Sequence, residues 1–232
     1  LHSAEGYFAV LDGDERARQV AGALSPEVRR TRRPPSAGRL DEVLRELDME
    51  GAFADETLRR LPAYVTQEAN RVYRREMLAA VADLRPVVYG EGWAGELPAG
   101  VELRGPADYY RDLPRIYRSD SVHLSLTNLQ MRAYPNQRAF DVGASRGCLL
   151  NDRLEGWTEL FGEAMEELVF DGAEQLHEAA ERLLADPSAR ARQGEMLHGV
   201  VLARHTMAHR VERVLEVLRR AAARRWESGD PV

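Results

Sequence analysis

The stretch that decides the fold is SVHLSLTNLQMRAYPNQRAFDVGASRGCLLND, residues 121–152. It predicts a strand, a loop, a short helix over about 137–145 that is closed by Gly147, and a second strand. The first N–H groups of a helix have no partner inside it, so a helix that starts beyond the carboxyl end of a strand favours anions. This helix start carries Arg138, which suits a phosphate, and Asp141, which suits sugar hydroxyls.

The flanking sequence alternates strands with helices, which is typical of βαβ units. We therefore expect an α/β fold with a Rossmann-like parallel sheet and flanking helices, in one domain over residues 1–232. Residues 6–15, GYFAVLDGDE, predict a first strand, and residues 15–84 predict a helical insertion after it. Thr206 is placed to cap a closing helix over 207–222, whose buried face we expect to be Val211, Val214, Leu215 and Leu218.

Parallel sheets bind ligands outside the carboxyl ends of their strands. The expected strands VVYGEGW and VELRG end in glycines, as does the first strand. That rule therefore places the ligand site at one edge of a single sheet, near Gly13, Gly90–Trp93, Gly105, the loop 127–136 and Asn151.

Composition excludes several classes of protein. The net charge of −6 argues against a dedicated nucleic-acid binder, and all 32 basic residues are arginine, which fits a GC-rich genome. The single cysteine, Cys148, excludes an internal disulfide and a cysteine-rich metal site. No apolar run approaches the length of a membrane span and no signal peptide is recognisable, so we expect a cytoplasmic protein.

Several motifs taken together resemble the donor-binding half of GT-B glycosyltransferases, most closely the CgeB-like (spore-maturation) family. PNQRAFDVGASRGCLLND resembles the family pattern of R-x-F-E, small residues, glycine and an apolar strand that ends in aspartate. VVYGEGW resembles its Y-G-x-G-W strand end, and RHTMAHRVERVLEVL resembles its closing helix. The resemblance covers about residues 86–218. Asp141 departs from it, because the family usually has glutamate there and aspartate reaches less far.

The resemblance implies a bacterial, metal-independent hexosyltransferase that binds a nucleoside diphosphate sugar and needs no cofactor. It also implies that the amino-terminal acceptor domain is missing and that the acceptor is unknown, so no catalytic residue is assigned. The donor-binding residues it indicates are Arg138, Asp141, Asn136, Asn128, Gly90, Gly92, Trp93, Gly105 and Tyr109.

Each of these assignments has a structural alternative. Asn128 and Asn136 can simply hold their turns, and Trp93 is as well suited to packing as to lining a pocket. The arginine runs at 29–33 and 219–225 predict solvated charge, with peripheral contact to acidic lipid headgroups as the lesser alternative. The rival function is a non-catalytic Rossmann-like binding or assembly module, which nucleotide binding would exclude.

Overall fold

The computed structural model describes residues 11, 13–93 and 95–228, and the side chains among them up to residue 223. Most of the segment predicted as a first strand lies outside these residues. Within it, Leu11 is helical and buried, and helix α2 already begins at Glu15.

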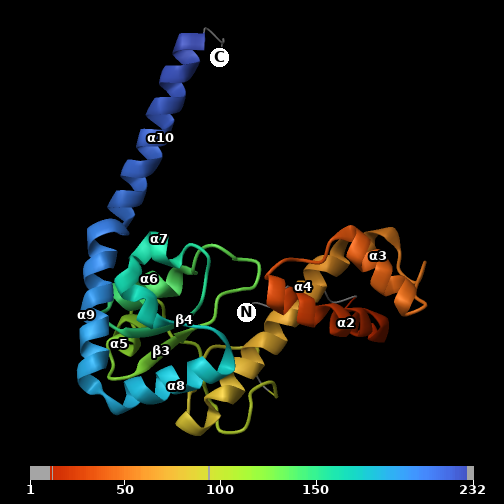
Figure 1. Cartoon of the computed structure of the whole chain (residues 1–232), viewed down its shortest axis with the longest axis horizontal. Coiled ribbons are helices and arrows are strands. Elements are labelled where there is room, and N and C mark those ends of the chain that lie inside the picture. Colours follow the sequence, from red (N-terminus) through yellow and green to blue (C-terminus); the bar gives the residue numbers. More distant parts are fainter. Residues whose placement is uncertain (1–10, 12, 94, 229–232) are drawn as a thin grey trace.

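Residues 15–84 form helices, namely α2 (Glu15–Thr31), α3 (Ala37–Glu46), α4 (Asp55–Ala80) and the 3-10 helix η1 (Ala82–Leu84). Of these, α2, α3 and the first part of α4 pack on one another as a lobe (Figure 1), whereas the end of α4 packs against α8 (Gly172–Ala185). The sequence pattern predicts separate helices on the two sides of Pro62, yet α4 runs through it. Proline removes one helical hydrogen bond, and the buried face of Leu61, Tyr64 and Val65 compensates for that loss. Treatment of this lobe as an insertion within one domain stays a prediction.

The rest of the chain confirms the α/β class, but its strands form two parallel sheets instead of one. The smaller sheet pairs β1 (Val87–Tyr89) with β2 (Glu102–Arg104). The larger has the order β3-β4-β5, with β3 (Val122–Ser125), β4 (Cys148–Asp152) and β5 (Val169–Phe170). The prediction that Gly90, Gly105 and Asn151 share the edge of a single sheet is therefore wrong. β1 and β2 pair only with each other over three positions, which leaves both outside the larger sheet.

The remaining helices, apart from α10, connect and cover these strands (Figure 1). They are α5 (Leu113–Tyr117), α6 (Gln137–Ala144), α7 (Trp157–Phe161), η2 (Glu163–Leu168), α8 (Gly172–Ala185), α9 (Pro187–Arg204) and α10 (Met207–Ser228). Strand β4 is buried along its whole length because both of its faces are covered. Leu149 packs in the cluster of α6, α7 and α9, whereas Leu150 packs with α8 and the end of α4. This alternation follows from the two-residue period of a strand.

Helix α10 departs from the predicted packing. It extends away from the body of the molecule (Figure 1), and the residues expected as its buried face are all exposed. Val211, Val214, Leu215 and Leu218 are between 43% and 58% accessible to solvent. The apolar period correctly indicates a helix, but the described residues of this chain do not cover its apolar face.

Gly147 allows β4 to approach its neighbours closely, and we expect Gly147→Ala to lower the free energy of unfolding by about 1–3 kcal/mol. An added Cβ would meet the Tyr117 carbonyl oxygen and come within 2.8 Å of Val142 Cγ1. Chemical denaturation measures the loss. Gly22→Ala is the control, because an added Cβ there meets nothing within 4 Å. Gly22 lies inside α2, so this variant should gain about 0.5–1 kcal/mol. Equal stability of the two variants would contradict the close approach.

Candidate functional site

The carboxyl ends of β3 and β4 carry buried polar side chains. Ser125, Thr127, Asn151 and Asp152 are each at most 1% exposed, and they lie where a parallel sheet presents its ligand site. Thr127 Oγ1 and Asn151 Oδ1 have no hydrogen-bond partner among the described residues. Because buried polar atoms are normally hydrogen-bonded, this edge holds unused bonding capacity.

Asp152 connects this edge to the helical lobe. Its Oδ1 accepts a hydrogen bond from the backbone N–H of Thr127 at 2.9 Å, and its Oδ2 accepts one from the Tyr73 hydroxyl at 3.2 Å. Arg32, at the left-handed C-cap of α2, also donates to Oδ2 and forms an ion pair with it. The Asp152 side chain is 2% exposed, so this is a buried ion pair. Burial and the Asp152 charge raise the pKa of the Tyr73 hydroxyl well above its usual range, which keeps it a hydrogen-bond donor.

Two further arginines have no counter-ion: Arg74, whose charge interacts with this carboxylate, and Arg138, whose charge interacts with Arg74. The side chains of Arg74 in α4 and Arg138 in α6 form no hydrogen bond or ion pair within the described part of the chain, and Arg74 Nε is buried without a partner. Burial and the positive charge of Arg138 lower the pKa of the Arg74 guanidinium, and the Asp152 charge acts in the opposite direction. Two like charges held close together with a single carboxylate nearby form a site that favours an anion.

The start of α6 is fixed at the end of β3. Asn136 is the N-cap, and its Oδ1 accepts a hydrogen bond from the Arg138 backbone N–H at 3.0 Å. Ser125 Oγ donates to the same oxygen at 3.4 Å. The Ala139 N–H bonds to the Asn136 carbonyl oxygen. The structure thus assigns Asn136 a capping role, and an anion at this helix start would compete with its side chain for the Arg138 N–H.

Asp141, one turn further along α6, meets another predicted binding residue. The Tyr109 hydroxyl lies 3.0 Å from both Asp141 carboxylate oxygens and accepts a hydrogen bond from Gln137. Burial and the Asp141 carboxylate raise the pKa of Tyr109. Tyr109 lies in a turn that precedes α5. The three side chains form an exposed polar group that offers both donors and acceptors to sugar hydroxyls.

The other predicted binding residues lie apart from this group. Asn128 Oδ1 accepts hydrogen bonds from Asn70 of α4 and from the Gln130 N–H, so it holds its loop against the helical lobe. Gly90, Gly92, Trp93 and Gly105 follow the strands of the smaller sheet. No hydrogen bond or ion pair of the described residues joins these four to Arg138 or Asp141. Their role in binding stays a prediction.

The sequence analysis missed Arg32, Tyr73 and Arg74 as site residues. The run at 29–33 was interpreted as solvated charge, which is wrong for Arg29 and Arg32, whose side chains are 25% and 18% exposed and ion-paired. No local motif marks Arg32, because its partner lies 120 residues later in the chain. Tyr73 and Arg74 are half-buried and lie between the buried residues Asn70 and Met77 of α4, and this position in an amphipathic helix is the signal that could have marked them.

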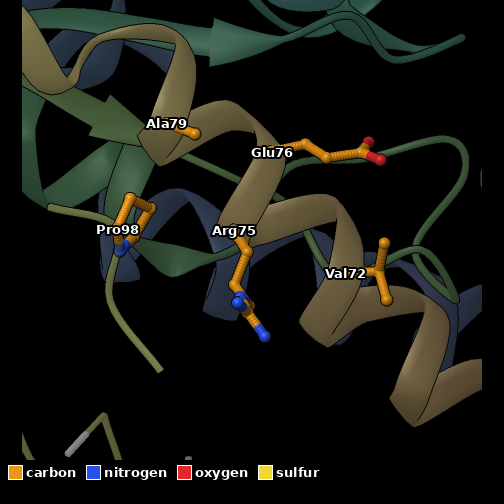
Figure 2. A pocket seen from close by; sticks show the side chains of 5 residues that line it. All are labelled: Val72, Arg75, Glu76, Ala79 and Pro98. Carbon is orange, nitrogen blue, oxygen red and sulfur yellow. The ribbon is translucent and has the colours of Figure 1, made fainter. Parts of the chain in front are cut away.

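A cleft of about 330 Å³ opens beside the Arg32–Asp152 pair. Its lining comes from the end of α2, the end of α4, and the residues that follow β4 and β5: Arg29, Arg30, Arg32, Tyr73, Glu76, Met77, Asp152, Arg153, Phe170, Asp171 and Gly172. Figure 2 shows a second hollow of about 370 Å³, between Pro98 and the α4 residues Val72, Arg75, Glu76 and Ala79. None of the predicted binding residues lines either hollow, and the first cleft adjoins the candidate site through Arg32, Tyr73 and Asp152.

The histidines near the carboxyl end are used structurally. His198, His205 and His209 bond respectively to the Gly143 carbonyl, the Leu160 carbonyl and the Thr206 hydroxyl. No three histidine, cysteine or acidic side chains of the described residues are grouped so that they could hold a metal ion. Among the same residues, no helix is long and apolar enough to span a membrane.

A family model described as glycosyl transferase-like matches residues 71–216, which is more than half of the chain. The matched stretch contains Tyr73, Arg74, Arg138 and Asp152, and Arg32 lies before it. No curated protein and no solved structure matches the chain.

Proposed function

The chain belongs to the glycosyl transferase-like family, and from this we propose that it binds the nucleoside diphosphate of a sugar donor at the carboxyl edge of β3 and β4. The finer assignment to a CgeB-like hexosyltransferase of GT-B architecture is part of the proposal. The order of Arg138, Phe140, Asp141, Gly147 and Asp152 along the chain supports it.

The observation that carries the proposal is the pair of arginines without a counter-ion. Arg74 lies close enough to Arg138 for their charges to repel, and the nearby carboxylate of Asp152 already bonds Arg32. A pyrophosphate would neutralise the charge of both guanidinium groups. Its oxygens would also accept hydrogen bonds from their N–H groups, and such charge-assisted bonds are strong. Arg138 stands in the first turn of α6, where the helix dipole disfavours a cation and a bound phosphate would offset that cost.

The polar group around Asp141 supplies the second part of the donor site. Its carboxylate accepts hydrogen bonds and lies one turn beyond Arg138, so vicinal hydroxyls of a ribose can replace the Tyr109 hydroxyl as its donors. The Tyr109 ring is 41% exposed and is then free to stack on a base. The assignment therefore orders the donor along α6, with phosphate at its start and sugar hydroxyls one turn on.

The proposed role in transfer is electrostatic. When the bond between the sugar and the diphosphate breaks, negative charge grows on the departing nucleoside diphosphate, and fixed positive groups stabilise that charge most. Arg74 and Arg138 are positioned by α4 and α6 for this task. We assign no catalytic base, and we propose that a second domain holds the acceptor in line with the donor.

Calorimetric titration with UDP, GDP and their nucleosides tests the proposal. We expect a nucleoside diphosphate to bind with or without a chelator, and the matching nucleoside to bind much more weakly, because the arginines act on the phosphates. A radiolabelled-donor assay on the same chain should show no sugar transfer, since an aligned acceptor supplies much of the rate. Absence of binding by every nucleotide would favour the rival function of an assembly module. Robust transfer would show that the acceptor site is already present.

A further inference from the structure

Helix α10 carries an apolar surface that the body of the molecule leaves uncovered (Figure 1). Six of its apolar side chains are at least 43% exposed, namely Met207, Val211, Val214, Leu215, Val217 and Leu218. Soluble proteins rarely expose a contiguous apolar surface of this kind without using it for an interaction. The question is which partner this helix fits.

The charged residues of α10 are arranged around the apolar stripe by sign. At 3.6 residues per turn, Glu216 falls opposite Met207, and Glu212 falls on the same far side. Arg219 borders the stripe beside Leu215 on one flank, and Arg213, Arg220 and Arg224 border it on the opposite flank, whereas Arg210 and Arg225 fall on the stripe itself. Arginines suit both positions at an interface between water and lipid, because their stems lie along the apolar surface while their charges reach the headgroups.

The net charge of the helix also favours contact with an anionic surface. Residues 207–228 contain six arginines and three glutamates, so this segment is positive in a chain whose net charge is −6. Glu216 is paired with both Arg213 and Arg220, which leaves an excess of positive charge on that flank. Each basic residue near an anionic membrane surface adds attraction.

The base of the helix is anchored to the body of the molecule. Arg210 donates to His205 Nδ1 at 3.1 Å, and its guanidinium lies 5.7 Å from the centre of the Phe140 ring. His205 in turn bonds the Leu160 carbonyl and packs against Phe140 and Phe161. The helix is thus attached to the layer that contains α6, the helix of the candidate donor site.

We propose that α10 is a membrane-surface helix, which lays its apolar face into the headgroup region of an anionic bilayer. A coiled coil with a second copy fits less well. The 4-3 spacing from Met207 to Leu218 would continue to Ala221 and then to Arg225, and the positions beside the stripe are also apolar at Leu215 and Val217. A coiled-coil seam is narrower and uses charged residues at those flanking positions.

Flotation with phospholipid vesicles tests the proposal on the whole chain. The protein should float with phosphatidylcholine vesicles that contain roughly one third phosphatidylserine, at least about tenfold more than with phosphatidylcholine alone. Leu218→Glu places a carboxylate in the apolar stripe and should lower binding to the anionic vesicles by about tenfold or more. Ala223→Glu is the matched control, because it adds the same charge on the exposed opposite side of the helix and should change binding by less than about threefold.

Neither substitution touches the core, so circular dichroism and thermal unfolding of both variants should match the parent protein. Absence of flotation with anionic vesicles would overturn the proposal, as would equal loss of binding in both variants. A dimer in solution that Leu218→Glu dissociates, without any affinity for vesicles, would overturn it in favour of self-association. None of these readouts depends on nucleotide binding.

Discussion

Asp152→Ala is expected to lower the free energy of unfolding by about 3–5 kcal/mol, the cost of breaking a buried ion pair by removal of one partner. The carboxylate is 2% exposed and accepts hydrogen bonds from Arg32, Tyr73 and the Thr127 N–H. Its loss leaves a largely buried guanidinium without its counter-ion and two buried donors without an acceptor. Urea denaturation followed by circular dichroism measures the change.

Two further variants distinguish loss of the buried Arg32–Asp152 ion pair from the effect of removing any carboxylate. Glu155→Ala removes a carboxylate that is 65% exposed from its ion pair with Arg132, and it should cost less than about 1 kcal/mol. Arg32→Ala combined with Asp152→Ala should cost less than the sum of the single changes, because no uncompensated buried charge then remains. Strict additivity would show that Arg32 does not depend on Asp152, and a small effect of Asp152→Ala would contradict the buried network itself.

Arg138→Ala is expected to weaken binding of a nucleoside diphosphate by about 1.5–3 kcal/mol, the scale of a charge-assisted hydrogen bond. The side chain is exposed and has no partner among the described residues, so its removal should leave the fold intact. Binding of the bare nucleoside should change little, because the guanidinium acts on phosphate. Calorimetry with both ligands measures the difference.

The comparison needs a second arginine and a control. Arg74→Ala should weaken binding of the nucleoside diphosphate by a similar amount, because Arg74 and Arg138 are both proposed to bind the pyrophosphate. Arg59→Ala removes an exposed arginine from the first half of α4 and should leave binding unchanged. If Arg138→Ala weakened binding of the nucleoside and of the diphosphate equally, the role of Arg138 would be structural. If it changed neither affinity, Arg138 would not belong to the site.

The local order of residues 121–152 predicts its part of the fold well. The period-two strand, the helix that starts at Gln137 and the apolar strand that ends at Asp152 all form where the sequence places them. Each depends on neighbours within a few residues, where propensity and capping act directly. The same local logic correctly brings Arg138 and Asp141 onto one short helix at the end of a strand.

What the sequence did not predict depends on contacts between distant segments. The separation of two sheets follows from how β1 and β2 pair only with each other, which no local pattern encodes. Arg32 looked like surface charge because its partner, Asp152, is far away in the chain. The apolar period of α10 indicates a helix correctly, but periodicity cannot tell whether a face meets protein, lipid or water.

The link between Arg32 and Asp152 has a consequence for how this protein can diverge. The matched family region begins at residue 71, so one member of a buried pair lies inside the matched region and the other lies before it. Selection cannot treat these two parts as independent modules. In descendants that replace the amino-terminal helices, position 152 should change to a neutral side chain in step with the loss of Arg32, so the two sites should covary.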